Sequence, residues 1–107
     1  MSKSATQFLY LTTLGWKTGK RHQIEIWFVE QKGRYYVLSE RKEDAHWVQN
    51  IAHVPAVSFS ISGKSSAGIA RIVSAENEKE LSEEISRLMK EKYGWGDGLI
   101  VELAPEN

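Results

Sequence analysis

Hydrophobic and polar positions along this chain fall into short runs that favour strands over helices. Residues 56–62 alternate cleanly, with Val57, Phe59 and Ile61 on one face and serines on the other, which is typical of a half-buried strand. Other runs rich in β-branched and aromatic residues show no helical period and predict strands at residues 6–13, 23–30, 34–39, 66–74 and 99–103. The pattern therefore predicts six strands.

Two segments show helical features instead. Residues 45–52 predict a short helix that Asp44 caps and that ends before Pro55, because the residue before proline is disfavoured in the helical region. The segment NEKE at residues 77–80 has the spacing of a capping box, and the helix that follows runs to about Lys92. Its apolar stripe consists of Leu81, Ile85, Leu88 and Met89.

The connections between the strands are mostly of hairpin length, so the strands are expected to pair antiparallel. Residues 31–33, with Gly33 in the turn, join the second strand to the third and make a meander with the first. Six strands with two helices predict a mainly β (α+β) fold. Its architecture is a closed or nearly closed small barrel with helices across its openings.

Composition and charge narrow the class of protein. The 107 residues include 14 basic and 14 acidic residues, a balance that argues against bulk attraction to nucleic acid or to an anionic membrane. There is no cysteine, which excludes disulfides and thiolate catalysis. No apolar run is long enough to span a bilayer, and the first residues lack the apolar core of a signal peptide. A single domain over residues 1–107, located in the cytoplasm, is expected.

The densest basic segment lies between the first two strands. Gly15 and Gly19 bracket a bend that carries Lys17, followed by Lys20 and Arg21, and such a bend suits an anion such as a phosphate. A solvated hairpin turn with scattered cations is the alternative, and residue types alone leave the two nearly even.

Other candidate sites are weaker. A metal site would need His22, His46 and His53 with carboxylates, but these histidines lie on separate elements or two helical turns apart, so no metal is expected. Trp47 is either a core anchor of the short helix or a wall beside a planar ring, and its spacing favours the core.

Three stretches of the chain resemble the deazaflavin-dependent nitroreductase and quinone reductase family. They are residues 11–20 (LTTLGWKTGK), residues 26–29 (IWFV) and residues 47–55 (WVQNIAHVP), where Trp47, Asn50, Ile51 and Pro55 carry the pattern. The resemblance covers about residues 8–104. It implies the flavin-binding split β-barrel and a homodimer with cofactor sites between subunits. It also implies the deazaflavin F-420 as hydride donor to quinones or nitro compounds, whereas relatives with the same fold use FMN.

The resemblance also implies positions for the cofactor. Lys17 matches the lysine that meets the phosphate side, and Thr18 and Gly19 complete that turn. Residues 24–28, including Ile26 and Trp27, are expected to lie along the ring system.

Further residues complete the expected site. Ser39 opens the loop that wraps the ring and tail, and Trp47 lies beside that loop. Arg21, His22 and Arg41 are expected to join Lys17 in holding the anionic part of the cofactor.

The hypothesis is therefore an oxidoreductase that binds F-420 and transfers hydride to a small quinone- or nitro-type acceptor. Tyr93 and Ser39 are the candidates for protonating that acceptor. An FMN-dependent flavin reductase and a non-catalytic flavin- or deazaflavin-binding protein are the alternatives. A small nucleic-acid-binding barrel is disfavoured by the zero net charge.

Overall fold

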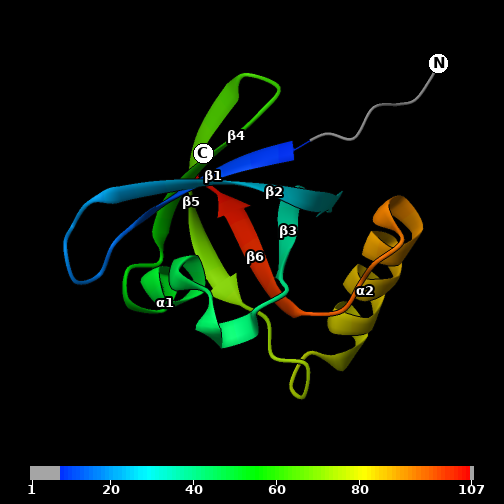
Figure 1. Ribbon diagram of the computed structural model, residues 1–107. Coiled ribbons are helices and arrows are strands. Elements are labelled where there is room, and N and C mark those ends of the chain that lie inside the picture. The colour runs from blue at the N-terminus through cyan, green and yellow to red at the C-terminus, as the bar shows by residue number, and fades with distance from the viewer. Residues whose placement is uncertain (1–7, 107) are drawn as a thin grey trace.

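The protein is a closed six-stranded antiparallel barrel flanked by two helices, as seen in the computed structural model, which describes residues 8–106 (Figure 1). Around the barrel the strands follow the order β1-β2-β3-β6-β5-β4, and every neighbouring pair is antiparallel. The strands are β1 (Phe8–Leu14), β2 (Arg21–Gln31), β3 (Arg34–Ser39), β4 (Ala56–Ile61), β5 (Lys64–Ile72) and β6 (Leu99–Pro105). The predicted fold class is confirmed.

The first hairpin is longer than its sequence pattern predicted. Pairing of β1 with β2 continues through Thr13 opposite His22 to Leu14 opposite Arg21, so Arg21 and His22 lie on β2 and not in the connecting loop. Strand β5 begins two residues earlier than expected because a two-residue turn at Ser62 and Gly63, both with positive φ, already reverses the chain. Residues 6 and 7 of the predicted first strand lie outside the described residues.

Both predicted helix caps are wrong. The short helix α1 (His46–His53) has Ala45 as its N-cap residue, since Asp44 belongs to a preceding 3-10 turn, η1 (Lys42–Asp44). The long helix α2 (Lys79–Tyr93) has Glu78 as its N-cap residue without a side-chain cap bond.

The predicted capping box fails for a local reason. The carboxylate of Glu78 accepts hydrogen bonds from Arg71 at 2.6 Å and from the Ser74 backbone N–H at 3.4 Å. The Asn77 backbone N–H donates to Ser74 Oγ in the preceding turn, so this segment closes a loop and does not cap the helix.

Two apolar cores hold the fold together. The first fills the barrel and includes Leu9, Leu11, Val37 and Leu103, all fully buried, with Ile51 of α1 closing one opening. The second lies between the outside of the barrel and α2 and consists of Val29, Tyr36, Leu38, Val73, Ile85, Met89 and Ile100. In Figure 1, α2 lies beside the ends of β2 and β3, while α1 lies below the hairpin of β1 and β2.

A buried carboxylate joins strands β3, β5 and β6. Glu102 is 4% exposed and accepts hydrogen bonds from Tyr36 and Arg34, both at 2.9 Å, and from two nitrogens of Arg71 at 3.2 and 3.3 Å. Burial of Glu102 by itself raises its pKa, but the bonds from Arg71 and Tyr36 and the nearby positive charges outweigh it, so the pKa lies below its usual value. Burial, together with the bond to Glu102, raises the pKa of Tyr36 to about 12.

Candidate functional site

The loop between β1 and β2 is a tight, internally bonded turn. The Gly15 N–H donates to the Lys20 carbonyl and the Gly19 N–H donates to the Gly15 carbonyl, each at 2.7 Å. A Cβ on Gly15 would lie 2.8 Å from Thr18 Oγ1 and 3.0 Å from His22 Nε2, so a side chain at this position would displace these two side chains. Gly19 has a φ of +73°, which glycine adopts without strain.

Three contacts hold this loop and the adjoining end of β1 to α1. Asn50, which is buried, donates through Nδ2 to Thr13 Oγ1 at 3.1 Å and accepts at Oδ1 from the Trp16 N–H at 3.4 Å. The Trp16 ring stacks on His53 with their centroids 3.9 Å apart. The loop therefore holds a defined position against the helix.

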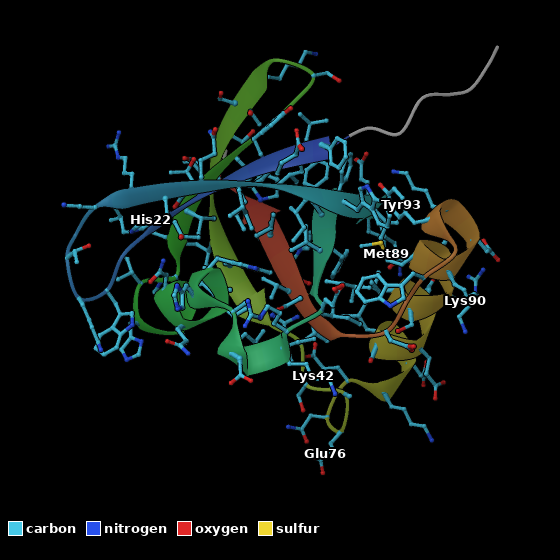
Figure 2. All side chains as sticks on the ribbon, viewed as in Figure 1. His22, Lys42, Glu76, Met89, Lys90 and Tyr93 are labelled. Atoms are coloured by element: carbon cyan, nitrogen blue, oxygen red, sulfur yellow. The ribbon has the colours of Figure 1, made fainter. Side chains whose placement is uncertain are left out.

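A large cavity opens between this hairpin and the segment that contains η1 and α1. Its volume is about 1020 Å³, and three parts of the chain line it: residues 15–26 of the hairpin except 19 and 20, residues 38–41 at the end of β3, and residues 44–50 except 48. Ligand cavities in proteins commonly span about 300–1,000 Å³, so the space is sufficient for a cofactor. Figure 2 shows His22 on the hairpin side of this region, away from α2.

Most of the predicted cofactor residues meet in this cavity. Its wall includes Lys17, Thr18, Arg21, His22, Ile26, Ser39, Arg41 and Trp47. Among the side chains that the structure describes, no ion pair involves Lys17, Arg21 or Arg41, and such cations can donate charge-assisted hydrogen bonds to an anion. Lys17 Nζ lies 5.0 Å from the centroid of the Trp16 ring.

Two of the predicted cofactor-binding residues do not line the first cavity. Gly19 shapes the turn but is not part of the cavity wall, and Trp27 lines a second cavity. Trp47 packs against the barrel core, as its spacing favoured, and it also lines the first cavity, where its role beside a planar ring stays a prediction. Ser39 is buried, and its hydroxyl donates to the Lys42 carbonyl at 2.9 Å, which fixes the start of the η1 segment.

The second cavity adjoins the first, and aromatic residues are the largest group in its lining. Its volume is about 440 Å³, and it lies between β2, the end of β3 and the C-terminal end of α2. The four residues that line both cavities are Glu25, Ile26, Leu38 and Glu40, and the second cavity is further lined by Phe8, Trp27, Met89, Tyr93 and Trp95. The two cavities thus share one wall.

Tyr93 holds α2 against β2. Its hydroxyl donates to the Phe28 carbonyl at 2.8 Å and accepts from the Phe28 N–H at 3.2 Å, and its ring stacks on Trp27 with centroids 4.5 Å apart. Lys92 Nζ donates to the same carbonyl at 3.0 Å. Figure 2 shows Tyr93 and Met89 between α2 and the barrel, on the side of the molecule opposite His22.

Several residues of the cavities were not among the predicted site residues. Glu40, Asp44 and His46 contribute ionisable side chains, and Asn50 anchors the loop. Glu25, which also lines both cavities, was expected there only as part of residues 24–28. Asn50 belongs to the motif that carried the family resemblance, and that was the only signal for it. Glu40 lies in the segment after Ser39 that the resemblance placed around the cofactor, but no role was assigned to its side chain.

Neither a metal centre nor a membrane span is found among residues 8–106. No group of three His, Asp or Glu side chains is arranged to hold a metal ion. The helices of the described chain are too short or too polar to cross a bilayer.

Comparison with solved structures supports the fold. HutZ, a heme storage protein from Vibrio cholerae, is 20% identical, with a TM-score of 0.78 over 95% of this chain and 83% of that one. A structure described as an F420 reductase is 15% identical, with a TM-score of 0.71 and coverages of 95% and 88%. An F420-H2 dependent reductase, FDR-A, is 24% identical, with a TM-score of 0.64 and coverages of 90% and 92%.

Sequence comparison adds a family. No curated protein matches the sequence at a significant level. The family model described as F420H(2)-dependent quinone reductase matches residues 3–96.

Proposed function

The chain belongs to the F420H(2)-dependent quinone reductase family and is therefore an oxidoreductase with F-420 as its cofactor, and we propose that it reduces a small quinone- or nitro-type acceptor. The single observation that supports the proposed site is the cavity of about 1020 Å³, whose lining brings cations from the hairpin and from the β3–α1 segment together with apolar and aromatic side chains. The acceptor and the residue roles below are proposals.

The side chains present fit a deazaflavin with an anionic tail. Lys17, Arg21 and Arg41 offer donors of charge-assisted hydrogen bonds to a phosphate, with Thr18 and His22 beside them on the same wall. The absence of ion pairs at these three cations within the described chain means that anion binding would break no such pair.

The opposite part of the cavity suits a flat ring. Ile26 and Leu38 supply apolar surface from β2 and β3, and Trp47 supplies a large aromatic face from α1. Such walls exclude water and fix the ring by contact, and when bound the deazaflavin supplies two-electron hydride chemistry.

The second cavity is the proposed place of the acceptor. It shares Ile26 and Leu38 with the first cavity, so a planar molecule there would lie next to the proposed ring position. Trp27 and Tyr93, which stack on each other, and Trp95 offer flat surfaces for such a molecule. The roles of Tyr93 and Ser39 as proton donors stay predictions.

A homodimer is part of the proposal. On the outer face of the barrel, Tyr10 of β1 and Ile69 of β5 are 39% and 43% exposed, and the strand between them presents Ser58 and Ser60. Large apolar groups around small side chains suit a flat contact with a second copy. Light scattering on wild type and on Ile69→Lys would test this, and a monomeric wild type would contradict it.

One cofactor-binding domain over residues 1–107 and a cytoplasmic location complete the proposal.

Titration with F-420 and, separately, with FMN tests the cofactor site. We expect the wild type to prefer F-420, and Lys17→Ala and Arg21→Ala each to weaken its binding about tenfold, because each removes one charge-assisted contact. Lys64→Ala is the matched control, since Lys64 begins β5 and does not line either cavity. Equal affinity of wild type and Lys17→Ala, with both folded, would contradict the assigned site.

Oxidation of reduced F-420 in the presence of quinones and nitro compounds tests the reaction. Turnover with either class supports the proposal. Tighter binding of FMN with turnover would indicate a flavin reductase, and cofactor binding without any turnover would indicate a binding protein.

A further inference from the structure

The two cavities differ in the charges on their walls. The first cavity is lined by basic Lys17, Arg21 and Arg41 together with acidic residues. The charged residues that line the second cavity, within the described chain, are Glu25 and Glu40, and both are acidic. The side chains that line the proposed acceptor cavity therefore carry net negative charge, beside a site that suits an anion.

Among the side chains that the structure describes, no cation forms an ion pair with Glu25 or Glu40. Lys92, on the α2 side, donates from Nζ to the Phe28 carbonyl, and this Nζ lies 4.4 Å from the centroid of the Phe28 ring and 5.1 Å from that of Tyr93. Lys92 itself lines a different depression. Arg21 begins β2, four residues before Glu25, so at the usual strand rise their backbone positions are about 13 Å apart. At that distance its charge is largely screened in physiological salt.

The two carboxylates come from neighbouring strands at the shared wall. Glu25 lies on β2, where the Tyr10 hydroxyl donates to its Oε2 at 2.9 Å, and this bond raises the pKa of Tyr10. Glu40 directly follows β3 and is exposed, and it lines both cavities. Any molecule that enters the aromatic cavity next to Ile26 and Leu38 passes close to both side chains.

We infer that Glu25 and Glu40 determine the charge class of the acceptor: planar neutral or cationic acceptors enter the second cavity, and anionic ones are disfavoured. This inference rests on the proposed function. Like charges repel, and for carboxylates that are exposed, as both of these are, the effect on a singly charged acceptor in contact with them is about three- to tenfold per carboxylate. Lys17 and Arg21, by contrast, are expected to affect cofactor affinity and not acceptor charge.

The test compares a neutral naphthoquinone with its sulfonate as acceptors. The measured quantity is the ratio of kcat/KM for the neutral to that for the anionic compound, so that intrinsic reactivity cancels between enzyme variants. We expect Glu40→Gln to lower this ratio about three- to tenfold, and Glu25→Gln to act in the same direction. Glu83→Gln, an exposed change on α2 that lines neither cavity, is expected to leave the ratio unchanged.

A binding measurement removes the cofactor from the test. Calorimetric titration of the protein without F-420, using redox-inert naphthamide and naphthoate, gives a ratio of dissociation constants. We expect the wild type to bind naphthamide more tightly than naphthoate, and Glu40→Gln to bring the two dissociation constants closer together. High salt is expected to bring them closer in the wild type as well, since exposed charges are screened.

The possible outcomes separate the inference from the proposed function. If every variant binds F-420 and turns over but Glu40→Gln and Glu25→Gln leave both ratios unchanged, the inference is wrong and the proposed function stands. If the wild type binds no F-420, the proposed function fails and the inference about the acceptor fails with it. A narrowed ratio in Glu40→Gln but not in Glu83→Gln supports the inference.

Discussion

Replacement of Glu102 by glutamine is expected to destabilise the barrel strongly. The carboxylate is buried at the junction of β3, β5 and β6, and its two oxygens accept four hydrogen bonds, one from Tyr36, one from Arg34 and two from Arg71. Glutamine keeps one acceptor oxygen but places an amide NH2 against donors on the other side. At least one arginine would then lose its acceptor.

The expected loss of stability in Glu102→Gln can be worked out from these contacts. A hydrogen bond to a charged group contributes about 1.5–3 kcal/mol, and the amide removes up to two such bonds. The side chains of Arg34 and Arg71 are 53% and 44% exposed, so water replaces part of the loss. We therefore expect Glu102→Gln to lower the free energy of unfolding by about 2–4 kcal/mol at neutral pH.

The pH dependence of stability provides a second test of the role of Glu102. Because the pKa of Glu102 is lower in the folded than in the unfolded state, its contribution is fully present above the usual carboxyl pKa and is lost as the pH falls through the native pKa. The difference in stability between wild type and Glu102→Gln should therefore shrink in strongly acidic solution.

Urea unfolding followed by tryptophan fluorescence measures both effects. The matched control is Glu91→Gln, which removes an exposed ion pair with Arg87 and is expected to change stability by less than about 0.5 kcal/mol. A Glu102→Gln variant as stable as wild type at neutral pH, or a difference that does not shrink in acid, would refute the reasoning.

Three other changes have expected outcomes. Asn50→Ala removes the bond to Thr13 and the anchor of the β1–β2 loop, so it should lower stability by about 1–2 kcal/mol and weaken F-420 binding; unchanged affinity in titration would argue against the anchoring role. Tyr93→Phe removes both bonds to Phe28 but keeps the ring, and should cost about 1–2 kcal/mol in urea unfolding; a loss of turnover far beyond this would instead support Tyr93 as proton donor. Gly68→Ala would place a Cβ 2.7 Å from a carbonyl oxygen of β6, and should lower the free energy of unfolding by about 1–3 kcal/mol; a midpoint equal to wild type would contradict this packing.

Most features that depend on residues close together in the chain were predictable from the sequence. The strands of the first hairpin, the tight turn at Gly15 and the apolar stripe of α2 were predictable because each depends on residues close together in the chain. The predictions of the two helix caps were wrong, although a cap also depends on residues close together in the chain. At α2, Arg71 from β5 engages the carboxylate of Glu78, so a tertiary contact competes with the cap.

The sequence by itself determined the barrel class, the cationic bend and, through its motifs, the family. Only the tertiary structure decided which side chains share a wall. Lys17 and Arg41 line one cavity although 23 residues separate them, and Trp27 and Tyr93 meet because α2 packs on β2. Periodicity and turn residues indicate the local environment of each segment. A cavity, by contrast, forms where segments distant in the chain leave the space between them unfilled. No local sequence pattern indicates that space.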